Sequence, residues 1–145
     1  MEQYVNILAR LPYSKPFLFV DSISTLSDDS ITGSFYLDPE LDFYRGHFKD
    51  KPVTPGVILT EIMAQIGLVC LGLHLTEASP QQAFPFALSS TEIEFMKPVF
   101  PGETVTVTGE KVYFRFGKLK CKVSMKNAAG ETVCEGTIAG IQLNE

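Results

Sequence analysis

Cysteine is scarce in this sequence: Cys70, Cys121 and Cys134 are far apart and form no C-x-x-C pair. An odd number at this spacing excludes a disulfide framework and offers no zinc-ligand pattern. Cys70 lies within an apolar run, so we interpret it as a core residue rather than a nucleophile. The chain is therefore expected in a reducing compartment, the cytoplasm, without a metal.

Positive charge is also in deficit, with 12 Lys and Arg against 17 Asp and Glu and a net charge of −5. A dedicated nucleic-acid-binding protein needs an electropositive face, which this balance disfavours. The N-terminus, MEQYVNILARLPYSKPF, has an acidic residue, Glu2, directly after Met1 and has no long apolar core, unlike a secretory signal. We therefore expect neither a nucleic-acid partner nor secretion.

Apolar residues, by contrast, make up 45% of the 145 residues, enough for one compact domain spanning 1–145 with a substantial core. The longest apolar run, Val57 to Leu75, approaches the length of about 20 residues that spans a membrane. Glu61, Gln65 and His74 within it make a lone membrane helix costly. We therefore predict a buried helix of a soluble protein and no membrane contact.

The remaining patterns predict an α+β fold in which antiparallel strands surround that helix. TVTVTGEKV and KLKCKVSM alternate in polarity, as strands with one wet and one dry face do. Thr54 is the expected N-cap, with Pro55 in the first helical position. The expected helices are 3–10 and about 55–76, and the expected strands are 17–24, 30–37, 83–99, 101–114, 116–126 and 131–143.

Two ionisable residues in GHFKDKPVTPGVILTEIMAQIG stand out, beginning with Glu61 inside the apolar helix. Burial favours the neutral form of a carboxyl, which raises its pKa and makes it a suitable general acid. Gln65 lies one turn further on the same face, where it can orient that carboxyl by a hydrogen bond. Structural hydrogen bonding is the alternative role for a buried Glu.

The second is His47, in a loop rich in Gly and Pro just upstream. Its imidazole is a suitable general base near neutral pH. The open helix N-terminus at Gly56 offers N–H groups that stabilise negative charge on a carbonyl oxygen. Together these groups fit removal of a proton alpha to a carbonyl with loss of a beta leaving group, although a loop His without function stays possible from the pattern alone.

The residues also resemble a known family. GHFKDKPVTPGVILTEIMAQ is similar to the central motif of FabZ-type 3-hydroxyacyl-[acyl-carrier-protein] dehydratases, roughly GHFPxxPxxPGVLxxEAMAQ. LPYSKPFLFVD resembles the family's LPHRYPFLLVD, and FMKPVFPGE resembles its RFKRPVxPGD. The matches run in order from about Leu11 to Ile138, so the resemblance covers nearly the whole chain.

The resemblance implies a hotdog fold, a curved antiparallel sheet around one long helix, in homodimers or trimers of dimers. It implies that His47 removes the alpha proton, that the partner subunit's Glu61 protonates the leaving hydroxyl, and that the Gly56 N–H binds the thioester carbonyl. The product is a trans-2-enoyl thioester on an acyl carrier protein. No metal, nicotinamide or flavin is implied.

The sequence departs from the family pattern at four positions: Tyr13 replaces a His, Lys49 a Pro, Thr54 a larger apolar residue and Ile62 an Ala. These changes affect the expected substrate more than the expected chemistry, because both catalytic positions are filled. Ile62 adds bulk beside Glu61 and indicates a reshaped acyl channel. Chain length, the choice between a housekeeping and a polyene pathway, and the choice between carrier protein and coenzyme A are left open.

Two further sets of residues are candidates for substrate contacts. An acyl chain needs an apolar channel, for which we expect Leu59, Ile62, Phe84, Phe86, Ile93 and Phe95, each of which also suits an ordinary core position. Carrier proteins are acidic, so docking should use basic side chains. The candidates form an expected local cluster of Lys97, Arg115, Lys118, Lys120 and Lys122, although lysines on an exposed strand also prevent aggregation.

Two alternatives of other classes bind the same kind of ligand. A hotdog acyl thioesterase hydrolyses the thioester, usually with an acid near the helix start that activates water. A non-catalytic acyl-binding subunit of a hotdog heterodimer lacks catalytic residues. The His47 and Glu61 pair favours the dehydratase over both.

Overall fold

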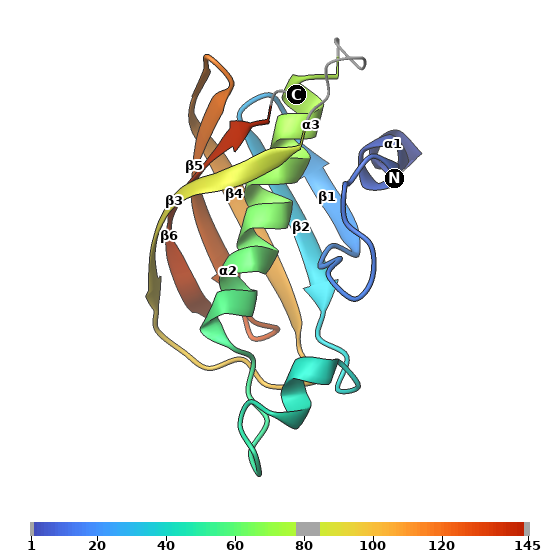
Figure 1. The fold of residues 1–145 in the computed structure, drawn as a ribbon, viewed down its shortest axis with the longest axis vertical. Coiled ribbons are helices and arrows are strands. Elements are labelled where there is room, and N and C mark those ends of the chain that lie inside the picture. The colour runs from blue at the N-terminus through green and yellow to red at the C-terminus, as the bar shows by residue number, and fades with distance from the viewer. Residues whose placement is uncertain (1, 78–84, 144–145) are drawn as a thin grey trace.

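The computed structural model of the chain describes residues 2–77 and 85–143. Within them, six strands form one antiparallel sheet in the order β1-β2-β4-β5-β6-β3, and a long helix packs against one face (Figure 1). The strands are β1 (Ser22–Leu26), β2 (Ser30–Tyr36), β3 (Phe86–Phe95), β4 (Thr104–Arg115), β5 (Lys118–Lys126) and β6 (Thr132–Gln142). This arrangement confirms the predicted α+β hotdog fold.

The long helix occupies Gly56–Leu75 and has three segments: α2 (Gly56–Ala64), the π-helical η2 (Gln65–Cys70) and α3 (Leu71–Leu75). Two shorter helices precede it, α1 (Glu2–Ala9) and the 3-10 helix η1 (Asp42–Arg45). With a mean hydropathy of 1.9 the long helix is apolar enough to cross a membrane, but 72% of its apolar window is buried inside the protein. It is the core helix of a soluble hotdog protein, as predicted.

Strand alternation builds the core. On β5 the residues Leu119, Cys121, Val123 and Met125 are buried, whereas Lys122 between them is exposed. Every second side chain of a strand points to the same face, so the apolar set faces the helix and the polar set forms the outer face of the sheet. The alternation predicted from the sequence is confirmed.

Two glycines set the distance between the helix and the sheet. A Cβ on Gly109 of β4 would lie 2.7 Å from the Cα of Gly67 in η2, and a Cβ on Gly67 would lie 2.8 Å from a methyl of Val123. Backbone therefore packs directly on backbone at this point. Any larger residue at Gly109 forces the two elements apart.

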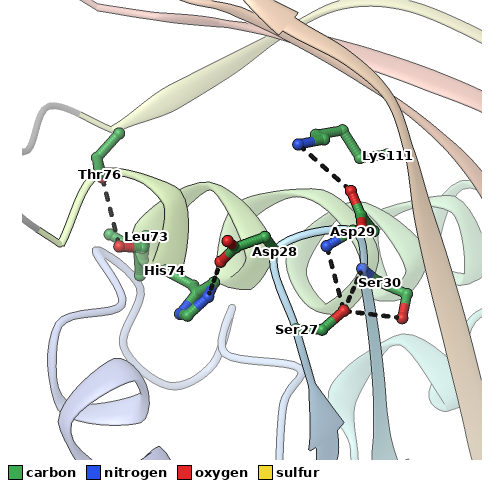
Figure 2. Close-up of polar contacts among 8 residues, drawn as sticks. All are labelled: Ser27, Asp28, Asp29, Ser30, Leu73, His74, Thr76 and Lys111. Carbon is green, nitrogen blue, oxygen red and sulfur yellow. Dashed lines mark hydrogen bonds and ion pairs between the residues drawn. The ribbon is translucent and has the colours of Figure 1, made fainter.

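The turn between β1 and β2 is tied to the far end of the long helix, as Figure 2 shows. Asp28 Oδ1 lies 2.9 Å from His74 Nε2 on α3, and Asp29 Oδ1 lies 3.6 Å from Lys111 Nζ on β4. The Ser27 hydroxyl accepts hydrogen bonds of 3.1 Å from the N–H groups of Asp29 and Ser30. These residues form the hairpin turn between two antiparallel strands, and His74, the second histidine of the chain, fastens it.

The strand expected at 17–24 is wrong in its first half, because β1 begins only at Ser22. The Phe19 N–H donates to Gln65 Oε1 at 2.8 Å, and the Phe17 carbonyl accepts from Gln65 Nε2 at 3.0 Å. A buried side chain on the helix thus takes the backbone hydrogen bonds that a neighbouring strand would otherwise take.

The strand expected at 83–99 is shorter in the structure, since β3 spans Phe86–Phe95. Residues 83 and 84 lie outside the described part of the chain. The N–H groups of Met96 and Lys97 both point to the Val133 carbonyl, at 2.8 and 3.2 Å, and Pro98 follows. This shared acceptor and the proline end the ladder early.

The expected N-cap is also wrong. Pro55 occupies the N-cap position, without a side-chain cap, and the helix begins at Gly56. The hydroxyl of Thr54 instead lies 2.6 Å from the Tyr44 hydroxyl, and its N–H donates to the Val99 carbonyl at 2.8 Å. Thr54 therefore anchors the loop before the helix rather than the helix itself.

Candidate active site

His47 lies in the loop that follows η1, and hydrogen bonds to backbone hold it in place. Its Nδ1 is 3.0 Å from the Val53 carbonyl oxygen, and its own carbonyl accepts from the Val53 N–H at 2.9 Å. A carbonyl can only accept, so Nδ1 carries the proton in the neutral ring. Nε2 therefore holds the basic lone pair.

Glu61 projects from α2 and is half-buried. Gln65 Nε2 donates to Glu61 Oε2 at 3.0 Å, which places the amide and the carboxyl on the same helix face as predicted. Gln65 itself is fully buried. The carboxyl is therefore held by a side chain that has no freedom to turn away.

Burial raises the pKa of Glu61 above its ordinary value, and the hydrogen bond from Gln65 opposes this shift only in part. Desolvation disfavours the charged form of a carboxyl, whereas an N–H donor favours it. The balance leaves a carboxyl that holds its proton more tightly than an exposed Glu does. Such a group can donate a proton to a leaving group.

Tyr13 is a neighbour of Glu61 to which the sequence patterns gave no site role. Burial and the nearby Glu61 charge raise the pKa of Tyr13 to about 12, with Cys70 adding a smaller contribution. Tyr13 therefore stays neutral beside the carboxyl. The one signal in the sequence that marked Tyr13 is that it occupies a position where the family commonly has a His.

Gly56 begins α2 and lies under an aromatic ring. A Cβ on Gly56 would be 3.3 Å from the ring of Phe95 at the end of β3, so a larger residue crowds this point. Two open grooves meet at this pair. One of about 390 Å³ extends over Leu59, Met96 and Lys97, and one of about 610 Å³ extends over Thr60, Thr91 and Ile93.

The structure places the acyl-channel candidates in different surroundings. Leu59, Ile93 and Phe95 line the grooves at Gly56. Ile62 is fully buried in the core and does not line either groove. Phe86, at the other end of β3, packs against Gly72 and lies 6.1 Å from the Phe114 ring, away from Gly56. Phe84 lies outside the described residues.

The expected basic cluster is not a single cluster within one chain. Lys97 lies at the Phe95 end of β3, where its Nζ is 3.2 Å from Glu131 Oε2. Arg115 and Lys118 flank the turn between β4 and β5 at the opposite end of the sheet. Lys120 lies near that turn, and Lys122 lines a groove of about 580 Å³ among glutamates on the outer face. The prediction of one local patch is therefore wrong for the isolated chain.

His47 and Glu61 are not joined within the chain. In the part of the chain that the structure describes, the His47 ring bonds to the Val53 carbonyl and Glu61 to Gln65, with no hydrogen bond between the two. Among the same residues, no group of three or more His, Cys, Asp and Glu is arranged to hold a metal ion.

Comparison with known families places the loop imidazole, the half-buried carboxyl and the open helix N-terminus within one matched domain. Residues 11–139 match the FabA-like domain. The chain belongs to the FabA-like family. This membership covers every residue of the site described above.

Curated FabZ dehydratases are similar to the chain over most of its length. It is 31% identical over 132 residues to the 3-hydroxyacyl-[acyl-carrier-protein] dehydratase FabZ of Clostridium perfringens strain SM101, covering 88% of this chain and 89% of that protein. It is 32% identical over 141 residues to the FabZ of Caldicellulosiruptor saccharolyticus, covering 95% and 96%.

Solved structures agree on the fold of this FabA-like protein. The dehydratase heterocomplex ApeI:P from Xenorhabdus doucetiae superposes with a TM-score of 0.80 at 14% identity, covering 96% of this chain and 91% of that chain. A hypothetical thioesterase from Streptococcus pneumoniae TIGR4, solved with coenzyme A, superposes with a TM-score of 0.66 at 14% identity, covering 100% and 98%. At such identities the similarity is one of fold alone.

Proposed function

We propose that this FabA-like protein dehydrates 3-hydroxyacyl-[acyl-carrier-protein] to trans-2-enoyl-[acyl-carrier-protein], in fatty-acid or related polyene biosynthesis in the cytoplasm. The relatives at 31–32% identity are dehydratases of this type. The observation that carries the proposal is Glu61, a carboxyl with a raised pKa that Gln65 orients inside an apolar helix. Elimination of water needs such a proton donor.

His47 is the proposed general base. Its Nε2 lone pair takes the alpha proton of the substrate, while Nδ1–H stays bound to the Val53 carbonyl. The electron pair of the broken C–H bond moves toward the thioester carbonyl oxygen. The Gly56 N–H and the positive end of α2 stabilise the charge that develops there.

Glu61 is the proposed general acid. As the Cα=Cβ double bond forms, the C–O bond at the beta carbon breaks, and the Glu61 proton joins the leaving hydroxyl to give water. His47 then returns its proton through solvent to the carboxylate, which closes the cycle. Neutral Tyr13 beside Glu61 adds no competing charge at this site.

The proposed site is shared between two chains, which explains why His47 and Glu61 have separate partners in one chain. β3 pairs with β6 on one side only, and its Leu88 and Phe95 side chains are about half exposed. An unpaired edge of this kind accepts another strand. We propose a homodimer through β3, or a trimer of such dimers, in which the partner subunit's Glu61 faces His47.

The test is incubation of the purified protein with a 3-hydroxyacyl-carrier protein. We expect water loss, observed as the enoyl product by mass spectrometry. Free hydroxy acid would instead show a thioesterase, and no turnover would show an acyl-binding subunit. A parallel reaction with the coenzyme A thioester decides which carrier the enzyme prefers.

A further inference from the structure

Two buried hydroxyls face each other where the His47 loop meets the body of the protein. The Tyr44 hydroxyl on η1 lies 2.6 Å from the Thr54 hydroxyl just before α2. Tyr44 is 5% exposed and Thr54 is 4% exposed, so solvent is largely excluded from this contact. Within the described residues, neither hydroxyl makes a second hydrogen bond. We name this contact the hydroxyl pair, and each of its members depends on the other.

The hydroxyl pair closes a loop, residues 45–53, that carries His47. Figure 1 shows this loop at the end of the molecule at which α2 begins. Inside it the backbone groups of Phe48 and Lys51 exchange two hydrogen bonds, at 3.0 and 3.2 Å. The Val53 N–H donates to the His47 carbonyl at 2.9 Å, and His47 Nδ1 lies 3.0 Å from the Val53 carbonyl. The loop is therefore a narrow hairpin, and the hydroxyl pair joins its two ends.

Thr54 is the fixed end of this hairpin. Its N–H donates to the Val99 carbonyl at 2.8 Å, and Val99 is fully buried. Val53, whose carbonyl holds the His47 ring, directly precedes Thr54, and Gly56 lies two residues after it. The hydroxyl pair ties η1, from which the His47 segment emerges, to this fixed point. The position of the imidazole relative to the Gly56 N–H thus depends on the pair.

The sequence marks the hydroxyl pair as a feature of this chain, because Thr54 stands where the family pattern has a larger apolar residue. An apolar side chain fills space without a preferred direction, whereas a hydrogen bond restricts both distance and angle. A directional contact therefore replaces simple packing at the base of the loop.

We propose that Tyr44 and Thr54 are positioning residues for His47. By closing the hairpin, their hydrogen bond holds the Val53 carbonyl against Nδ1, which keeps the proton on Nδ1 and leaves the Nε2 lone pair free. The same bond fixes the distance from Nε2 to the Gly56 N–H, the two groups that set the places of the alpha proton and the thioester oxygen. The catalytic consequence rests on the proposed function, whereas the effect on the imidazole tautomer does not.

Stability and positioning can be separated, because removing one hydroxyl differs from removing both. Thr54→Val leaves the Tyr44 hydroxyl buried without a partner, so the melting temperature should fall by about 5 °C. Adding Tyr44→Phe removes that unpaired group, and the double variant should melt within about 2 °C of the wild type. Thr54→Ser keeps the hydroxyl but loses a buried methyl group, and it should melt about 3 °C lower.

The catalytic test measures kcat for enoyl formation in the same proteins. The double variant should lose about tenfold in kcat with KM changed by less than about twofold, because a misplaced base slows the chemical step rather than binding. Thr54→Ser should keep kcat within about twofold of the wild type, since it retains the hydrogen bond. Activity thus follows the hydrogen bond and not the melting temperature. A double variant with wild-type kcat would overturn the proposal.

The second test reads the His47 ring directly and needs no substrate. The chain has two histidines, so their ring nitrogen NMR signals can be assigned at a pH that leaves imidazole neutral. In the wild type, His47 should show the Nδ1–H tautomer, and His74, whose Nε2 lies 2.9 Å from Asp28 Oδ1, the Nε2–H tautomer. The double variant should show both tautomers at His47 and no change at His74. A pure Nδ1–H ring at His47 in this variant would refute the positioning role, whatever its activity.

Thr32→Val with Thr108→Val is the matched control. These two hydroxyls lie 3.3 Å apart between β2 and β4, outside the loop, so the control deletes a contact of the same kind. It should change neither kcat nor the His47 tautomer. An effect on either as large as that of the double variant would show that the hydroxyl pair has no specific role.

Failure of this inference is separable from failure of the proposed function. If the wild type converts no 3-hydroxyacyl thioester, the proposed function fails, and the tautomer measurement still decides whether the hydroxyl pair holds His47. If the wild type is active and the double variant matches it in kcat and tautomer, the positioning role is refuted while the dehydratase stands. Should the double variant not fold, Tyr44→Phe alone removes the same hydrogen bond, and the same outcomes decide.

Discussion

Gln65 holds the carboxyl of Glu61 through a hydrogen bond of 3.0 Å from its Nε2 to Oε2. The same amide accepts a hydrogen bond from the Phe19 N–H at Oε1 and donates one to the Phe17 carbonyl from Nε2. These two contacts fix the orientation of the Gln65 amide, with Nε2 toward Glu61. A segment more than 40 residues earlier in the chain therefore sets the orientation of the acid. The carboxyl is positioned by the fold before any substrate arrives.

Replacing His47 should remove the proposed base without harming the fold. His47→Ala is expected to lower kcat for enoyl formation by at least about a hundredfold, because general base catalysis contributes roughly that much. Lys51→Ala, in the same loop, is the control and should retain activity. Thermal unfolding should be similar for all three proteins, and a His47→Ala enzyme with normal turnover would remove His47 as the base.

Mixing two inactive variants should restore activity if sites are shared between chains. A dimer of one His47→Ala chain and one Glu61→Gln chain has one site with both defects and one site with neither. We therefore expect about half of the wild-type turnover per dimer from tandem-purified mixed protein. An inactive mixed dimer would show that both groups act within one chain.

The raised pKa of Glu61 predicts a pH-dependent stability. The folded state binds this proton more tightly than the unfolded chain, so its stabilising effect is present below the ordinary pKa of 4.5 and is lost as the pH rises through the folded pKa. The side-chain amide of the Glu61→Gln variant cannot titrate. Relative to the wild type, the variant should gain in free energy of unfolding between about pH 4 and pH 7. Urea unfolding of the wild type and the variant at both pH values measures this gain. A difference in free energy of unfolding that is the same at both pH values would contradict it.

The contact of Gly109 with Gly67 predicts a strong effect of one methyl group. Gly109→Ala should lower the free energy of unfolding by about 3 kcal/mol, because backbone rather than a flexible side chain occupies the space. Gly46→Ala, where an added Cβ meets nothing within 4 Å, should stay within about 0.5 kcal/mol of the wild type. Equal urea midpoints for the two variants would refute the packing argument.

The three cysteines should be unreactive in the folded protein. All are free and buried, and burial raises the pKa of each thiol to about 12. A thiol reagent at pH 8 should label none of them in native protein and all three in guanidinium, as counted by mass spectrometry. Labelling of native Cys70 would contradict its assignment to the core.

Much of this fold could be predicted because its patterns are local. The alternation on β5 and the apolar run of the long helix each reflect a repeat that the chain itself carries. The start of β1 was missed because the bonds of Phe17 and Phe19 go to Gln65, a partner distant in sequence. The role of Thr54 was missed for the same reason, since its hydroxyl binds Tyr44 rather than the helix.

In the candidate site, too, contacts between residues close in sequence could be predicted, and contacts between distant residues could not. The contact between Glu61 and Gln65 follows from helix spacing and was expected, whereas the nearness of Tyr13 to Glu61 depends on tertiary packing. The basic residues were expected together because they share a sign, yet the sheet places Lys97 and Arg115 at opposite ends. Which basic residues lie together depends on the order of the strands in the sheet, and no local sequence pattern encodes that order.

The absence of two side chains at Gly67 and Gly109 also determines where a long substrate can go. Helix and sheet touch there, so an acyl chain that entered beside Gly56, as the proposed function requires, would meet a closed contact at this point. The open space runs instead along Thr60, Thr91 and Ile93, beside the free edge of β3. If the proposed activity and the proposed dimer through β3 hold, we therefore expect the accepted length of acyl chain to be set at the interface between subunits, and mutations that change it to lie there rather than in the interior of the protein.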